Sequence, residues 1–154
     1  MSEEETVNII RNFTEAIMKQ DVEKTLSFLT EDVIWVQPEG IFKGKDEVRR
    51  LLAWLSRSFW YSQLNVQDAG IGIFVRGNKA VYEQTIGGVS AHKRMFKAPA
   101  TSIFEFKGEK IQQFRILYDR ITLGKQACGR EGYGGWLDRK ILAGILNTWE
   151  EGLR

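Results

Sequence analysis

The sequence predicts an α+β domain in which helices come first and a curved sheet follows. Apolar residues recur at helical spacing in the first 60 residues, whereas alternating β-branched and aromatic residues dominate residues 63–119. A further helical pattern runs from about Trp136 to Glu151. The central hairpin of the sheet is expected over Thr101–Asp119, with Gly108-Glu109 as a two-residue type II′ turn.

The composition is that of one globular domain with little net charge. The chain has 154 residues, of which 43% are apolar, and 22 basic against 20 acidic residues give a net charge of +2. These interspersed charges argue against a nucleic-acid-binding protein. One cysteine, Cys128, excludes an internal disulfide and favours a reducing compartment. The acidic start MSEEETVNII is unlike a signal peptide, and no apolar run suits a membrane helix, so we expect a cytoplasmic protein.

The first half of the chain carries clear start and stop signals. Ser2 and Glu5 form a capping box, and Asp21 is the cap of a second, short helix. The expected elements, in order, are a helix over 2–19, a short helix from 21, a strand over 33–36, a turn over 38–40, a returning strand over 41–43 and a helix from 44.

The second half is expected to be β-rich and then to leave the sheet. Strands are predicted within 63–86, and Ser90–Pro99 is interpreted as a loop or a strand edge. The predicted organisation is a main domain over 1–123, a glycine-rich connection over 124–135 and a helical extension over 136–154. The broad apolar stripe of that extension needs cover, either from the open end of the curved sheet, as a lid, or from a partner subunit.

The register of the central hairpin decides which side chains share a face. A two-residue turn pairs Phe106 with Ile111 and places Phe104 on the face of Arg115, whereas a loop of odd length places Phe104 beside Phe114.

Three segments carry a resemblance to a known family. They read FTEAIMKQDVEKTLSFLTEDVIW, IFKGKDEVRRLLAWL and FEFKGEKIQQFRILYD, and they lie between Asn12 and Asp119. Together they resemble the SnoaL-like and ketosteroid-isomerase-like group of the nuclear transport factor 2-like superfamily. The resemblance implies a cone-shaped barrel of a strongly bent mixed or antiparallel sheet wrapped around N-terminal helices, here with an extra C-terminal helix. It also implies an apolar pocket and a homodimer formed through the sheet, with contacts such as Ile73 and Leu117.

The catalytic residues of ketosteroid isomerases have no equivalents in this sequence. The matching positions are Phe13 for the tyrosine, Gln37 for the aspartate base and Ser102 for the second acid. Phe13 cannot donate a hydrogen bond and Gln37 cannot take a proton at neutral pH, so no steroid isomerase of that type is expected. The polyketide cyclases of the group use an acidic residue in the same cavity, whose match stays open.

The pocket is expected to combine aromatic and amide side chains. The resemblance places Phe114, Ile116 and Tyr118 inward. The candidate ligand-binding residues are Trp35, Gln37, Trp54, Tyr82, Gln84, Phe104, Phe114 and Tyr118. Ordinary core packing is the alternative for most of the aromatic residues.

No catalytic residue is assigned, and the candidates each have a structural alternative. They are Asp119, Tyr118, His92 and Glu83. His92 is either a general base at the pocket mouth or an exposed loop histidine. Asp119 is either a general acid or a partner of backbone and arginine groups, and Glu83 is either a buried acid or a solvent-facing charge. A single histidine excludes a histidine-based metal cluster, and no cofactor is expected.

Three functions remain open at this point. The first is a SnoaL-like enzyme with cofactor-independent acid–base chemistry of the cyclase, isomerase or dehydratase kind on a small apolar or aromatic molecule. The second is a ligand-binding module without chemistry, and the third is a dimeric interaction module. The expected partners are the small molecule and a second copy of the chain, with neither nucleic acid nor membrane.

Overall fold

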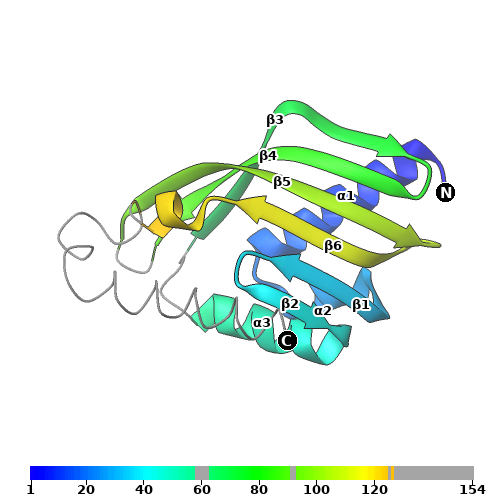
Figure 1. Cartoon of the computed structure of the whole chain (residues 1–154), viewed down its shortest axis with the longest axis horizontal. Coiled ribbons are helices and arrows are strands. Elements are labelled where there is room, and N and C mark those ends of the chain that lie inside the picture. The colour runs from blue at the N-terminus through cyan, green and yellow to red at the C-terminus, as the bar shows by residue number, and fades with distance from the viewer. Residues whose placement is uncertain (58–62, 91–92, 125, 127–154) are drawn as a thin grey trace.

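The computed structural model of the chain describes residues 1–57, 63–90, 93–124 and 126 (Figure 1). Within these residues the chain forms helices and one bent sheet, so the predicted α+β class is confirmed. The elements are α1 (Glu3–Met18), α2 (Val22–Ser27), β1 (Leu29–Gln37), β2 (Gly40–Lys43), α3 (Gly44–Arg57), β3 (Gln63–Arg76), β4 (Lys79–Val89), β5 (Met95–Lys107) and β6 (Lys110–Tyr118). A helical turn at 120–124 follows β6.

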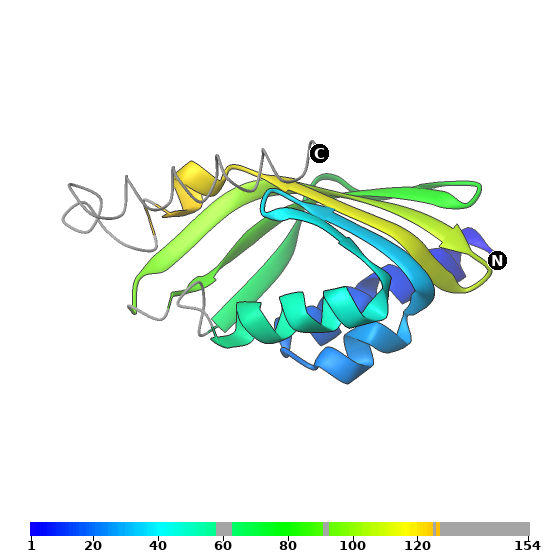
Figure 2. The ribbon, with the colours of Figure 1, turned by 60° about the horizontal axis from the view of Figure 1, so that its bottom comes forward.

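The sheet is mixed and open. Its strand order is β2-β1-β6-β5-β4-β3, with β1 and β6 parallel and the other neighbours antiparallel. The sheet bends strongly. It does not close into the barrel that the resemblance implied, because β2 and β3 remain free edges. Helices α1, α2 and α3 lie on its concave side, and no helix of the described residues covers the convex side (Figure 2).

The helix starts follow the capping signals of the sequence. The Ser2 hydroxyl accepts a hydrogen bond from the Glu5 backbone N–H at 3.2 Å, and the Ser2 N–H donates to the Glu5 carboxylate at 2.6 Å. The Asp21 carboxylate accepts from the Lys24 N–H at 2.9 Å. These caps fix where α1 and α2 begin, and hence which face of α1 meets the sheet.

The β5–β6 hairpin combines both alternatives that the sequence left open. Gly108 has a φ of +61°, and the strands pair Lys107 with Lys110 across a two-residue turn, as predicted. Phe106 faces Ile111, yet Phe104 faces Phe114, because the register shifts after Glu105. This β-bulge inserts one residue into β6 and brings the two phenylalanines to the same side.

Two parts of the sequence prediction need correction. Ser90–Pro99 was interpreted as a loop or a strand edge; the loop alternative is wrong for 95–99, because β5 begins at Met95, includes Pro99 and pairs there with β4 alone. Proline is tolerated there because β6 ends opposite Ala100, so β5 has no neighbour on that side. Ile73 was expected on the convex face, but it packs against the core.

Several expectations lie outside the described residues. They concern most of the glycine-rich connection at 124–135, the helical extension at 136–154, His92 and Cys128. No helix among the described residues is long and apolar enough to cross a membrane.

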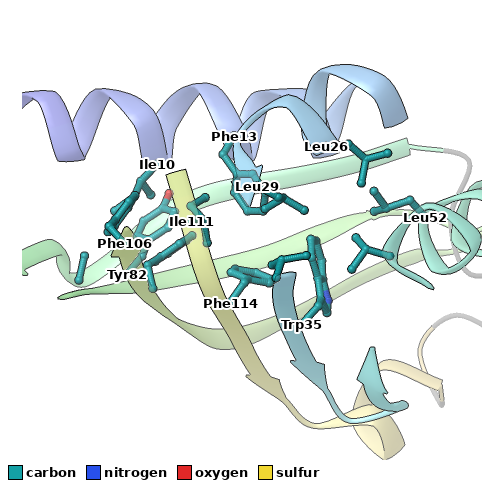
Figure 3. Close-up of a cluster of buried hydrophobic side chains, with 14 of the residues drawn as sticks. Ile10, Phe13, Leu26, Leu29, Trp35, Leu52, Tyr82, Phe106, Ile111 and Phe114 are labelled. Atoms are coloured by element: carbon teal, nitrogen blue, oxygen red, sulfur yellow. The ribbon is translucent and has the colours of Figure 1, made fainter. Parts of the chain in front are cut away.

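The core lies between α1 and the concave side of the sheet, and Phe13 is at its centre (Figure 3). The Phe13 ring centroid lies 5.2 Å from that of Phe114, 5.9 Å from that of Phe104 and 5.8 Å from that of Trp35. These separations are typical of aromatic pairs that pack edge to face or tilted. The cluster forms the rigid floor on which the candidate site is built.

Candidate ligand cavity

A cavity extends from this aromatic floor toward the end of the sheet where β1 and β6 terminate. Its wall comes from α1, α3 and the concave side of the sheet, and it includes Leu123 of the helical turn at 120–124. The space open to the centres of water-sized molecules is about 120 Å³. One bound water needs only ~10–15 Å³ by this measure, so the cavity has room for a small organic molecule.

The floor of the cavity is aromatic. Phe13, Trp35, Phe104 and Phe114 all line it, and each is at most 3% exposed. The Trp35 indole N–H donates a hydrogen bond to the Gln37 side-chain oxygen at 2.8 Å. A flat apolar molecule would therefore contact the faces and edges of these rings. The indole N–H of Trp35, the one polar group among the four side chains, is already hydrogen-bonded.

One end of the cavity carries a carboxylate. Glu39 lies in the turn between β1 and β2 and lines the cavity. Its carboxylate accepts hydrogen bonds from the Gln37 side-chain amide at 2.8 Å and from the Tyr118 hydroxyl at 2.9 and 2.8 Å. The parallel pairing of β1 with β6 brings Tyr118 to this turn.

Arg120 balances the charge of Glu39. Its Nε lies 3.2 Å from a Glu39 carboxylate oxygen, and the two side chains are only 17% and 10% exposed. The contact is an ion pair without a well-aligned hydrogen bond, because the Nε hydrogen has no acceptor in line with it. The Arg120 guanidinium also donates to the Pro38 carbonyl at 3.3 Å. Arg120 therefore holds the β1–β2 turn against the helical turn at 120–124.

A second polar group lies on the sheet side of the cavity. The Gln84 side-chain amide of β4 donates a hydrogen bond to the Ser102 hydroxyl of β5 at 2.8 Å. The two residues are 4% and 1% exposed, and both line the cavity. They are neutral at all ordinary pH values.

The structure brings most of the predicted ligand-binding residues to this cavity and leaves two outside it. Those that line it are Trp35, Gln37, Gln84, Phe104, Phe114 and Tyr118. Trp54 does not, and its side chain on α3 is 46% exposed. Tyr82 is buried in the core, with its hydroxyl turned to Asp68.

Tyr82 belongs instead to a link between α1 and the sheet. Its hydroxyl donates to the Asp68 carboxylate at 2.8 Å, and the Arg11 guanidinium pairs with the same carboxylate, with one contact at 2.7 Å. Hydrogen bonds from Arg11 and Tyr82 lower the pKa of Asp68 to about 2. Burial, together with the bond to Asp68, raises the pKa of Tyr82 to about 12. The group stabilises the contact of α1 with β3 and β4 away from the cavity.

Of the other catalytic candidates, neither Asp119 nor Glu83 lines the cavity. The Asp119 carboxylate accepts from the backbone N–H groups of Ile121 and Thr122 at 2.9 and 3.1 Å, so it caps the helical turn at 120–124. The Glu83 carboxylate accepts from the Ile71 N–H at 2.8 Å and fills the space above Gly70, where a Cβ would lie 1.9 Å from it. His92 is outside the described residues.

Glu39 is the residue that sequence reasoning missed. It was read as part of a turn, although it continues the two-residue spacing of Trp35 and Gln37. That alternation could have placed all three on one face. The positions matched to isomerase residues, Phe13, Gln37 and Ser102, also line the cavity. Among the described residues no cluster of three metal-ligating side chains occurs.

The sequence profile of the SnoaL-like domain family matches residues 10–114. The chain belongs to the SnoaL-like family. The matched range includes α1 from Ile10 onward, the β1–β2 turn with Glu39, and β5 with Ser102. A comparison with curated proteins finds no match.

Solved structures share the fold at low sequence identity. A nuclear transport factor 2-like protein of unknown function from Burkholderia pseudomallei K96243 has a TM-score of 0.72 at 18% identity, covering 84% of this chain and all of that one. A protein from Jannaschia sp. CCS1 assigned as a SnoaL-like polyketide cyclase has a TM-score of 0.71 at 12% identity, covering 84% and 97%. TerC, co-crystallised with polyporic acid, has a TM-score of 0.70 at 16% identity, covering 80% and 98%. At these identities the likeness shows the fold of this SnoaL-like chain and no more.

Proposed function

We propose that this SnoaL-like protein binds a small apolar or aromatic molecule in the cavity and transforms it by cofactor-independent acid–base chemistry, with Glu39 as the proton-transfer group. The observation that carries the proposal is the position of Glu39. Among the described residues that line the cavity, it is the one charged side chain. The surrounding wall is otherwise apolar, aromatic or neutral.

A carboxylate in this position has the geometry of a proton-transfer residue. It lies at the edge of an apolar cavity, where a bound molecule would have little water around it. Gln37 and Tyr118 orient the carboxylate through hydrogen bonds, and Arg120 balances its charge. Positioned acids and bases of this kind contribute typically ~10²–10⁴-fold to a reaction rate.

The fold comparisons support small-molecule binding as the class of function. Two similar structures contain small molecules, polyporic acid in TerC and trimethylamine in a protein from Catenulispora acidiphila. Two others are assigned as polyketide cyclases, from Jannaschia sp. CCS1 and Silicibacter sp. TM1040. The reaction type proposed here is in keeping with that assignment.

The same contacts favour a second candidate, ligand binding without chemistry. The two oxygens of the Glu39 carboxylate share the one hydrogen of the Tyr118 hydroxyl, and one of them also faces Arg120. These partners occupy most of the roughly four acceptor sites of a carboxylate, so few remain for a bound molecule. The two candidates therefore differ in whether Glu39 becomes free when a molecule enters the cavity.

The ring opening of 5-nitrobenzisoxazole separates the two candidates. A base removes the proton on the ring carbon, the N–O bond breaks, and a coloured nitrophenolate forms, so the reaction reports a base that reaches an apolar aromatic molecule. We expect the protein to open the ring faster than buffer does, and Glu39→Gln to lower that rate by about 10²-fold.

Glu109→Gln is the matched control, because Glu109 lies on the exposed hairpin turn. This control variant should keep the full rate. A wild-type rate equal to that of buffer, with the compound bound, would leave only the binding function. A Glu39→Gln rate equal to that of the wild type would remove Glu39 from the proposal.

We further propose that the protein works as a homodimer in the cytoplasm, with residues 1–123 as the main domain and 136–154 as its extension. The dimer is supported by exposed apolar side chains on the convex side of the sheet, such as Phe74 and Leu117, which are 55% and 51% exposed. The cytoplasmic location is supported by the single cysteine.

A further inference from the structure

We propose that Gln84 and Ser102 form a neutral binding subsite that takes an uncharged oxygen, a hydroxyl or a carbonyl, of an aromatic molecule in the cavity. The inference rests on the proposed ligand cavity, but it does not depend on proton transfer by Glu39. It names the chemical class of the ligand and the way the ligand is oriented.

The first support is unused hydrogen-bonding capacity in a buried place. Gln84 and Ser102 are 4% and 1% exposed, and the amide-to-hydroxyl bond of 2.8 Å is the one hydrogen bond that their side chains make to described residues. Among the described residues the Gln84 carbonyl oxygen therefore has no donor and the Ser102 hydroxyl hydrogen has no acceptor. Buried polar groups in proteins are nearly always bonded, so these groups on the cavity wall take a partner from the cavity, which is water or a polar group of a ligand that replaces it.

The second support is that the Gln84–Ser102 pair can still both accept and donate hydrogen bonds. The pair offers an oxygen that accepts and O–H and N–H groups that donate. Turning the Gln84 amide over exchanges which group is free, but it still leaves the pair with unused donors. A ligand hydroxyl or carbonyl oxygen can satisfy such a pair, whereas a hydrocarbon would leave its polar atoms unbonded at a cost in binding.

The third support is the charge of the cavity wall. Among its described lining residues Glu39 is the single charged one, and the guanidinium of Arg120 is already paired with it. An anionic ligand group would lose its water near a negative side chain with no free cation opposite. Losing water without such a partner is costly for an ion, so the oxygen at Gln84 and Ser102 is uncharged.

The sheet register sets the distance between the two polar ends. Gln84 of β4 is paired with Ala100 of β5, and Ala100 is paired with Tyr118 of β6. Gln84 and Tyr118 are thus two strand spacings apart, about 10 Å between backbones. Ala100, which lies between them in the register, is buried and has only a methyl side chain. An aromatic ring system can lie across this gap, with its oxygen at Gln84 and Ser102 and its far end toward Tyr118 and Glu39.

Binding of three related compounds tests this inference on the unmodified protein. They are 2-naphthol, which has an uncharged hydroxyl, naphthalene, which has no oxygen, and 2-naphthoate, which is anionic. We expect 2-naphthol to bind about tenfold more tightly than naphthalene, the ratio that one net hydrogen bond gives, and 2-naphthoate to bind most weakly. Equal affinities for 2-naphthol and naphthalene, the absence of binding by both, or tightest binding of 2-naphthoate would each overturn the inference.

Substitution of Gln84 and Ser102 then tests whether these two residues cause the preference for 2-naphthol. In a Gln84→Leu and Ser102→Ala double variant, 2-naphthol should lose its tenfold advantage while naphthalene binds as before or more tightly. Thr101→Val is the control, since Thr101 neighbours Ser102 in β5 but belongs to the opposite face of the sheet. A double variant that keeps the tenfold preference would overturn the assignment.

The outcome of these binding measurements does not depend on the result of the Glu39→Gln experiment. A Glu39→Gln protein that retains full ring-opening activity refutes the proposed proton transfer, yet the 2-naphthol preference would still stand. If the double variant does not fold, the comparison of compounds on the unmodified protein still decides the question.

Discussion

The hydroxyl oxygen of Tyr118 lies 2.9 and 2.8 Å from the two carboxylate oxygens of Glu39, although the residues are 79 positions apart in the chain. The parallel pairing of β1 with β6 makes this contact possible, because it brings the end of β6 beside the turn that leaves β1. The contact joins the two strands at the end of the cavity, next to the ion pair of Glu39 with Arg120.

A double-mutant cycle measures this contact. Tyr118→Phe and Glu39→Ala each remove one partner, and the free energies of unfolding of the four proteins follow from urea titration. We expect a coupling free energy of about 1.5–3 kcal/mol, the range for a hydrogen bond to a charged group in a partly buried place. Additive single effects would show that the Tyr118–Glu39 bond does not form in solution.

The identity of the elements could be predicted from the sequence, because local signals determine them. The capping box of Ser2 and Glu5 and the turn at Gly108 need only a few neighbouring residues. The position of Phe104 beside Phe114 could not be predicted in the same way. It depends on a bulge in β6, and nothing in the local sequence distinguishes a bulge from a longer loop.

The residues of the candidate site were also predictable only in part, because some of their positions depend on strand pairing. The resemblance placed Phe114 and Tyr118 inward, and both line the cavity; alternation along β1 could also have found Glu39 from Trp35 and Gln37. Tyr82, a candidate from the sequence, does not line the cavity. Its hydroxyl bonds to Asp68 because β3 lies beside β4, and a single sequence does not reveal that pairing.

The link of Arg11, Asp68 and Tyr82 predicts that the free energy of unfolding depends on pH in the acidic range. The pKa of Asp68 is about 2 in the folded protein and 3.8 as its ordinary value, so the unfolded chain takes up this proton first as the pH falls. The stabilisation from Asp68 is therefore complete above about pH 4 and is lost between there and about pH 2.

Asp68→Asn isolates this contribution. The variant should be less stable than the wild type by about 1 kcal/mol at neutral pH, since half of the Asp68 side chain is exposed and solvent weakens the pair. The difference in free energy of unfolding should shrink as the pH falls toward 2. Asp46→Asn serves as the control, because the Asp46 side chain is 95% exposed. A difference that stays constant over this pH range would contradict the assignment.

The convex side of the sheet carries an apolar row that crosses all six strands of the described structure. Phe74, Val81, Ile103, Arg115, Val36 and Ile41 follow one another in register from β3 to β2. Arg115 is the one polar residue in the row, and Phe74 and Ile41 are 55% and 52% exposed. Leu117, on the same side, lies next to this row on β6 and is 51% exposed. A largely apolar surface of this kind is typical of a surface that a second protein covers.

Charge placed on this surface tests the proposed homodimer. Light scattering should give about twice the chain mass of 17.7 kDa for the wild type. Phe74→Glu and Leu117→Glu should shift the protein to the monomer mass, because a carboxylate buried between two apolar faces loses its water without a partner. Trp54→Glu puts the same charge on an exposed aromatic position of α3, on the helical side of the sheet, and should leave the dimer intact. A wild-type protein that stays at the monomer mass at high concentration would refute the dimer, and a dimer that survives both charged substitutions would place its interface elsewhere.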